Sequence, residues 1–148
     1  MVKVYIAGPL YNESERLFNE KIAAICEGLD CGTFLPHRDV GLQNDSNGFS
    51  IYKKDLKGII NSDIIVANLN GCDVDSGTAW ELGYGYAHHK YLIGVHTDMR
   101  VSEPHSEVNN MILQSTKIVH SLEEFESLLK IFIERYFSKK DYAHASGY

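Results

Sequence analysis

The stretch DIIVANL, Asp63–Leu69, is a nearly continuous apolar run that is rich in β-branched residues. A run of this length and composition is typical of a strand that is buried on both faces of a parallel sheet. Short apolar runs of the same kind recur along the chain, as VKVYIAG (Val2–Gly8), GTFLP (Gly32–Pro36), YLIGVHT (Tyr91–Thr97) and KIVH (Lys117–His120). The sequence therefore predicts about five strands.

Helical patterns separate these runs. We expect helices at Asn12–Leu29, Ser50–Ile60, Gly77–His89, Asn109–Gln114 and Ser121–Phe137, and a loop over the polar segment 37–48. Because strands alternate with helices, the pattern predicts an α/β fold, a doubly wound parallel sheet with helices on both faces.

Two helix starts carry recognisable signals. The first helix has an apolar stripe and Ser14 as its expected cap. The last helix begins with Ser121, and Glu124 follows three residues later, which is a capping-box pattern. The residues expected in the apolar stripe of the first helix are Leu17, Ile22, Ile25, Cys26 and Leu29.

The composition narrows the class of protein. With 148 residues, 44% of them hydrophobic and 23% charged, residues 1–148 are expected to form one globular domain, with 138–148 as a polar tail. The net charge is −6, and the basic residues are scattered along the chain. Such a surface is unsuited to tracking a phosphate backbone, so we do not expect nucleic acid to be a partner.

We expect neither a membrane span nor a disulfide framework. No apolar run approaches the ~20 residues of a spanning helix, and Met1 leads into a strand-like segment rather than a signal peptide. Cys26, Cys31 and Cys72 form no CxxC pair, which favours free, mostly buried thiols in the cytoplasm. The histidines lack metal-ligand spacing, so we expect no metal and no organic cofactor.

In parallel α/β sheets, ligands bind beyond the carboxyl ends of the strands, near the point where the strand order reverses. This rule selects Tyr11 after the first strand, His37–Asp39 after the second, and Asp73–Asp75 after the third. Dinucleotide-binding and Walker glycine motifs are absent from the sequence, as are a G-x-S-x-G elbow and an H-E-x-x-H pair.

One carboxylate stands out within DVDSGTAWELGYGYAHHK, Asp73–Lys90. Glu81 lies about one turn inside a helix, where the helix dipole favours an ionised group at neutral pH. None of its neighbours at three or four positions is a cation, and we expect Gly77 and Gly85 to leave open space beside it. The alternative for Glu81 is a partly exposed helix residue.

Other polar residues surround this carboxylate in the predicted fold. Asp75 is expected on the ligand side of the sheet, or as the N-cap of the helix at Ser76. Asp55 is either a site residue or a solvated helix charge among lysines. Tyr5 and Tyr11 bracket the end of the first strand, where a tyrosine hydroxyl could hold a carboxylate in place.

Three segments together resemble the nucleoside 2-deoxyribosyltransferase family. They are VYIAGPLY, KKDLKGI followed by SDIIVANL, and DVDSGTAWELGYGYAHHKYLIGV, and the resemblance covers roughly residues 2–119. It implies a flavodoxin-like fold and transfer of 2-deoxyribose between bases of 2′-deoxynucleosides, with net retention through two inversions. Such activity belongs to nucleotide salvage.

The resemblance also implies roles for individual residues. Glu81 matches the nucleophile that attacks C1′, and Tyr5 the residue that orients it. Asp55 matches the residue that contacts the base and transfers a proton, and Asp75 the residue that binds the sugar hydroxyls. Asn109 and Met111 match residues that a neighbouring subunit contributes, which implies a homo-oligomer. The positions expected to contact substrate in addition are Gly8, Tyr11, Ser76 and Gly77.

Two other functions remain open. Nucleoside 5′-monophosphate N-glycosidases share the fold and the glutamate but transfer the sugar to water, and Ser76 and Ser106 are compatible with them. Asp75 would repel a phosphate, which favours a nucleoside substrate. A nucleotide-sensing module without turnover is the third possibility. The preference between purines and pyrimidines is not predicted.

Overall fold

The structure is a computed structural model that describes residues 1–42, 47–98 and 108–145, and the side chains up to residue 138. All the strand pairs of its sheet are parallel, and the strand order is β2-β1-β3-β4-β5. This order is that of the flavodoxin-like fold, so the predicted architecture is confirmed. The strands are β1 (Lys3–Ala7), β2 (Gly32–Phe34), β3 (Ile64–Asn68), β4 (Tyr91–Val95) and β5 (Lys117–Val119).

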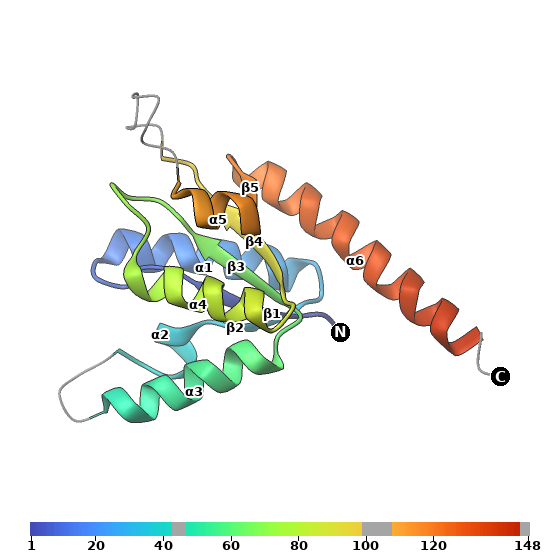
Figure 1. Cartoon of the computed structure of the whole chain (residues 1–148), viewed down its shortest axis with the longest axis horizontal. Helices are drawn as coiled ribbons and strands as arrows, with labels where there is room; N and C mark the ends of the chain where they lie inside the picture. Colours follow the sequence, from blue (N-terminus) through green and yellow to red (C-terminus); the bar gives the residue numbers. More distant parts are fainter. Residues whose placement is uncertain (43–46, 99–107, 146–148) are drawn as a thin grey trace.

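Helices connect the strands and cover both faces of the sheet (Figure 1). Two differences from expectation appear. A short helix, α2, lies within the segment expected to be a loop, and the last helix continues past Phe137 through most of the expected tail. The helices are α1 (Glu13–Gly28), α2 (Pro36–Asp39), α3 (Gly48–Asn61), α4 (Ser76–Ala87), α5 (Asn110–Ser115) and α6 (Leu122–Ala145). Within the described ranges, no helix combines the length and apolarity of a membrane span.

Each central strand contributes to two hydrophobic cores. In β1, Val4 and Ile6 pack into the core that contains α1 and α6. Tyr5 and Ala7 point to the opposite face, into the core beneath α3 and α4. The same alternation holds in β3, where all residues of the strand are buried. A strand buried on both faces needs apolar residues at successive positions, which is why DIIVANL is continuous rather than alternating.

The start of α1 differs from the expected one. Asn12, not Ser14, is the N-cap: its Oδ1 accepts a hydrogen bond from the backbone N–H of Glu15 at 2.9 Å, and the Asn12 N–H donates to Glu15 Oε2 at 3.1 Å. Leu17 is 48% exposed, because five residues before Ile22 place it about 140° away around the helix.

The polar residue Asn19 instead occupies the buried stripe of α1, with Ile22, Ala23 and Cys26. One bond of the capping box expected at α6 forms, since Ser121 Oγ accepts from Glu124 N at 3.1 Å, whereas the Glu124 carboxylate accepts from the His120 N–H at 2.7 Å instead of from Ser121. Cys26 and Cys31 are buried and Cys72 is exposed, all as free thiols.

Candidate active site

A pocket of about 450 Å³ opens at the carboxyl ends of β1 and β3, where the strand order reverses. Its walls come from the loop after β1, from the segment around α2, and from helices α1, α3 and α4. Three carboxylates reach it. The lining residues are Gly8, Leu10, Tyr11, Arg16, Pro36, Gly41, Leu42, Ile51, Asp55, Asp75, Gly77, Thr78 and Glu81.

Glu81 is held by a buried tyrosine. The Tyr5 hydroxyl donates a hydrogen bond to Glu81 Oε1 at 2.5 Å. Tyr5 itself is fully buried, and its ring stacks on Phe34 with 5.4 Å between ring centroids. Because the tyrosine cannot move freely, it fixes the carboxylate in one position at the pocket wall.

The charge state of Glu81 differs from the expected one. The pKa of Glu81 is raised to about 8: burial is the largest cause, the Tyr5 hydrogen bond acts in the opposite direction, and the charges of Asp55 and Asp75 add to the rise. The helix start was expected to favour the anion at neutral pH. The carboxylate is enclosed mostly by protein and is only partly accessible from the pocket. The loss of surrounding water therefore outweighs the stabilisation of the anion by the helix dipole.

This pKa predicts how stability depends on pH. An unfolded glutamate ionises near its ordinary value of 4.5, whereas folded Glu81 keeps its proton until about pH 8. The folded state therefore binds more protons, so this group's contribution to stability is fully present below pH 4.5 and is lost as pH rises through 8. We expect Glu81→Gln to melt at a higher temperature than wild type at pH 9 and at a similar one at pH 4.5, measured by circular dichroism. An equal difference at both pH values would contradict the shifted pKa.

Asp55 is not a solvated helix charge. It is partly buried on α3, and its Oδ1 is buried with no hydrogen-bond partner in the described part of the chain. Burial raises the pKa of Asp55 to about 6, and the positive charge of Lys54 acts in the opposite direction. A buried oxygen without a partner is costly, and here it lies in a pocket wall, where a ligand can supply the missing donor.

Asp75 is both the N-cap of α4 and a residue of the pocket wall, the two positions considered for it from the sequence. It is the N-cap of α4, with Oδ2 accepting from the Thr78 N–H at 2.9 Å and from Thr78 Oγ1 at 3.1 Å. The other oxygen, Oδ1, accepts from the Tyr11 hydroxyl at 3.2 Å. The cap fixes the carboxylate, and it remains part of the pocket wall together with Tyr11 and Gly77.

A buried amide pair shapes the loop after β1. Asn68 Nδ2 donates to Asn19 Oδ1 at 2.9 Å, and Asn19 Nδ2 donates to the Pro9 carbonyl at 3.0 Å. A Cβ at Gly8 would lie 2.6 Å from Asn19 Oδ1, so only glycine allows this close approach. Asn19 was not among the residues expected at the site. Its signal was a polar residue in the apolar stripe of a helix.

Gly85 does not leave space beside Glu81. A Cβ at Gly85 would lie 2.1 Å from Ile65 Cδ1, so this glycine lets α4 pack closely on β3. Gly77 and Gly85 therefore serve different purposes, since Gly77 lines the pocket and Gly85 does not.

Arg16 is a pocket residue that the sequence analysis missed. It lies on α1, one turn after the N-cap, and its Nη1 donates to the Leu10 carbonyl at 2.7 Å. It is the only cation among the lining residues described above. A guanidinium in the pocket wall offers hydrogen-bond donors to a ligand. Nothing in the local sequence around Arg16 marks it, because the turn after β1 is what brings α1 to the pocket.

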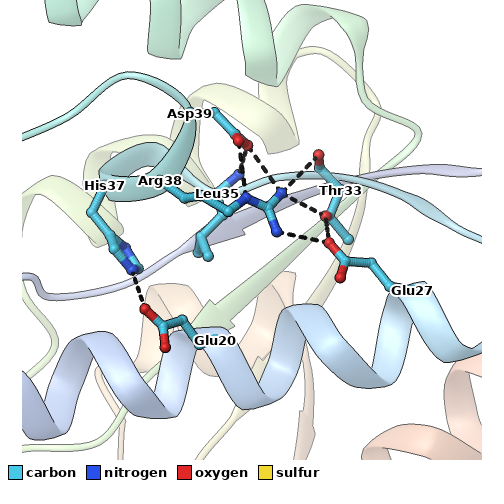
Figure 2. Close-up of polar contacts among 7 residues, drawn as sticks. All are labelled: Glu20, Glu27, Thr33, Leu35, His37, Arg38 and Asp39. Atoms are coloured by element: carbon cyan, nitrogen blue, oxygen red, sulfur yellow. Dashed lines mark hydrogen bonds and ion pairs between the residues drawn. The ribbon is translucent and has the colours of Figure 1, made fainter.

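Several expected residues lie elsewhere. His37 and Arg38 form a separate polar network, shown in Figure 2: His37 contacts Glu20 at 3.1 Å, and Arg38 contacts Glu27 at 2.8 Å. Asp39 accepts from the Leu35 N–H and pairs with Arg38. None of these three side chains lines the pocket.

Asp73 and Ser76 are exposed and also lie outside the pocket wall. Asn109 is the N-cap of α5, and Met111 is 77% exposed; neither reaches the pocket of its own chain. Ser106 falls outside the described residues.

The family follows from comparison with known sequences. Residues 4–126 match the family model described as nucleoside 2-deoxyribosyltransferase. The chain belongs to this family. The match contains Tyr5, Asp55, Asp75 and Glu81. A search of curated proteins gave no match.

Solved structures of family enzymes have the same fold. The 2-deoxyribosyltransferase from Bacillus psychrosaccharolyticus is 25% identical, with a TM-score of 0.71 over 84% of this chain and 90% of its own. The enzyme from Leishmania mexicana is 26% identical, with a TM-score of 0.67 over 90% and 98%. The CMP N-glycosidase of Clostridium botulinum is 18% identical, with a TM-score of 0.56 over 88% and 98%, which is a likeness of fold alone.

This deoxyribosyltransferase-family chain has no group of three or more His, Cys, Asp or Glu side chains arranged to hold a metal ion, as far as the described residues extend. The pocket contains three carboxylates. Glu81 accepts a hydrogen bond from Tyr5, Asp75 accepts one from the first turn of α4, and the pKa of Asp55 is raised less far than that of Glu81. This donor set suits attack on, and stabilisation of, an electron-poor carbon.

Proposed function

We propose that the protein transfers 2-deoxyribose from one nucleobase to another by a double displacement with retention. The observation that carries this proposal is the fixed Glu81 carboxylate, bonded to Tyr5, in the same pocket as Asp55 and Asp75. A pocket of about 450 Å³ falls within the range of small-molecule sites.

In the first half-reaction, an oxygen of ionised Glu81 attacks C1′ of the deoxynucleoside. The bond from C1′ to the base nitrogen breaks, its electron pair leaves with the base, and Asp55 gives the base a proton. A deoxyribosyl ester of Glu81 results. In the second half-reaction, a nitrogen of another base attacks C1′ from the face that the first base left, its proton returns to Asp55, and Glu81 is released as the anion.

The proton inventory of the pocket suits this sequence. Between about pH 6 and pH 8 the Glu81–Asp55 pair holds one proton, mainly on Glu81, and the productive form is the less populated one with the proton on Asp55. The Tyr5 hydroxyl favours the anion of Glu81 by donating to it. Asp75, already fixed as a helix cap, presents its other oxygen to a sugar hydroxyl.

One observation favours the alternative, hydrolysis of a nucleoside 5′-monophosphate. Arg16 places a cation in the pocket wall, where it can bind a phosphate. Against this, Asp75 lies in the same wall and would repel the anion. We therefore assign the nucleoside as the substrate, and the base or the sugar edge as the group nearest Arg16.

A single assay separates the two. Deoxyinosine or thymidine is incubated with and without free adenine, and the corresponding 5′-monophosphates are incubated in parallel. We expect new deoxyadenosine only when adenine is present. Rapid release of base from the monophosphates, at a rate that does not depend on adenine, would contradict the transferase and favour the hydrolase.

We also propose that the protein self-associates and that the neighbour's Asn109 and Met111 complete the pocket. Large exposed apolar residues concentrate on α3, α4 and α5, including Phe49 (72% exposed), Trp80 (49%) and Met111 (77%). These helices lie on one side of the sheet (Figure 1). A group of this kind is typical of a protein interface.

The variant Trp80→Glu tests this interface. Trp80 stacks on Tyr84 with 5.1 Å between centroids and is half exposed, so a charge there disrupts an interface but little of the monomer's core. We expect sedimentation to show a smaller species, with base exchange reduced in proportion. Leu17→Glu, an equally exposed position on α1, is the control. An unchanged mass for Trp80→Glu would place the interface elsewhere.

A further inference from the structure

A second cavity lies on the far side of α3, away from Glu81. Its volume is about 410 Å³, comparable to that of the candidate active site. The wall is formed by β1 and the edge strand β2 on one side and by the second half of α3 on the other. The lining residues are Met1, Lys3, Val4, Gly32, Thr33, Phe34, Asp39, Val40, Lys54, Lys57, Gly58, Asn61 and Ser62.

The base of this cavity is apolar and partly aromatic. Phe34 is only partly buried although it lies within a strand, because its side chain forms part of the cavity wall. Gly58 of α3 faces it: a Cβ there would lie 2.8 Å from the Phe34 ring. The glycine therefore keeps α3 close to the ring, at a cost to helix propensity that a surface helix usually avoids.

The rim is positively charged. Lys3, Lys54 and Lys57 line the cavity and are exposed, and none of the three ammonium groups forms an ion pair within the described part of the chain. The acid in the wall, Asp39, is neutralised by Arg38 at 2.9 Å.

The helix end does not oppose an anion here. The carboxyl end of a helix repels anions, but Lys90 Nζ already covers the carbonyls of Ile60 and Ser62, at 2.6 Å each. The electrostatic potential in the cavity is therefore set by its lysines and is positive.

We propose that this cavity binds a small aromatic anion, a flat ring that carries a phosphate, sulfonate or carboxylate. The ring lies against Phe34 and Gly58, and the anionic group meets Lys54 and Lys57. This inference does not require the proposed function, since it concerns a separate site.

Two contacts connect the cavity to the candidate active site. Phe34, in its wall, stacks on Tyr5, and Tyr5 holds Glu81. Lys54, on its rim, directly precedes Asp55 on α3 and acts to lower the pKa of Asp55. An anion bound to Lys54 cancels part of that positive charge, and the pKa of Asp55 then rises.

Fluorescence of 8-anilinonaphthalene-1-sulfonate measures binding on the full chain without turnover. We expect saturable enhancement in wild type and weaker affinity, by about tenfold or more, in the double variant Lys54→Gln, Lys57→Gln. The matched control is Lys53→Gln. Lys53 precedes Lys54 on α3, but it lies outside the cavity, with Nζ 4.8 Å from the centroid of the Phe49 ring. We expect the dye affinity of this variant to stay within about twofold of wild type. Circular dichroism verifies that the variants fold.

Further probes separate the contributions. N-phenyl-1-naphthylamine, which has the rings without the sulfonate, is expected to bind wild type and the double variant alike. A nucleoside 5′-monophosphate that displaces the dye identifies a nucleotide as the ligand type, whereas displacement only by an aromatic carboxylate identifies a non-nucleotide anion. Equal dye affinity in the double variant and in wild type, or loss of dye binding in Glu81→Ala, would overturn the proposal.

Discussion

Replacing Glu81 with alanine is expected to abolish base exchange, by on the order of 10⁴-fold or more in kcat, because Glu81 is the carboxylate that Tyr5 holds in the pocket wall, whereas Asp75 caps α4 and Asp55 is assigned to proton transfer. The Glu81 carboxyl lines the pocket and does not pack in the core, and its raised pKa shows that the folded state disfavours its charged form. Its removal is therefore not expected to destabilise the fold. Steady-state exchange between thymidine and adenine gives the rate, and thermal melting gives the stability.

The matched control is Asp73→Ala. Asp73 is an exposed carboxylate in the loop that leads to α4, and it does not line the pocket, so its removal should leave the rate within about twofold of wild type. Retention of exchange in Glu81→Ala would rule out the double displacement. Absence of exchange in wild type on every deoxynucleoside would favour a sensing module.

The second large effect concerns Asp55 and the pH profile. In wild type we expect a bell-shaped dependence of kcat/KM with limbs near pH 6 and pH 8, the values to which burial raises the pKa of Asp55 and of Glu81. Below the lower limb both carboxyls are protonated and no nucleophile exists. Above the upper limb both are ionised and no proton is available for the leaving base.

Asp55→Asn keeps the shape of the side chain and removes the proton. We expect a loss of about 10²- to 10⁴-fold, the usual contribution of a general acid. The decline above pH 8 should disappear, and the residual rate should rise with pH as Glu81 alone ionises. A variant that keeps both limbs of the profile would show that Asp55 is not the proton donor.

Much of the fold was predictable because burial on two faces leaves a direct trace in sequence. Four successive residues of β3, Ile64–Ala67, are apolar, and each strand–helix alternation implies a parallel pair. The helix ends were less predictable. Asn12 and Ser14 are both good caps, and only the side-chain bond to Glu15 decides between them.

The carboxylates of the pocket were predictable for a different reason. Asp75 follows a strand, at the edge where ligands bind, and Glu81 stands in an apolar run without a local cation. Arg16 and Asn19 could not be predicted as neighbours of the site, because their positions depend on how α1 turns back over β1. The raised pKa of Glu81 could not be predicted either. The sequence indicates the helix dipole, but it does not indicate how much water is lost around the side chain.

The central claim is the covalent intermediate on Glu81. Wild-type protein is mixed with a deoxynucleoside in the absence of acceptor base, quenched in acid, and analysed by intact-mass spectrometry and peptide mapping. The account predicts a mass increase of one deoxyribosyl group, located on the peptide that contains Glu81 and lost when adenine is added before the quench. Base exchange without any such adduct, or an adduct on a residue other than Glu81, would contradict it.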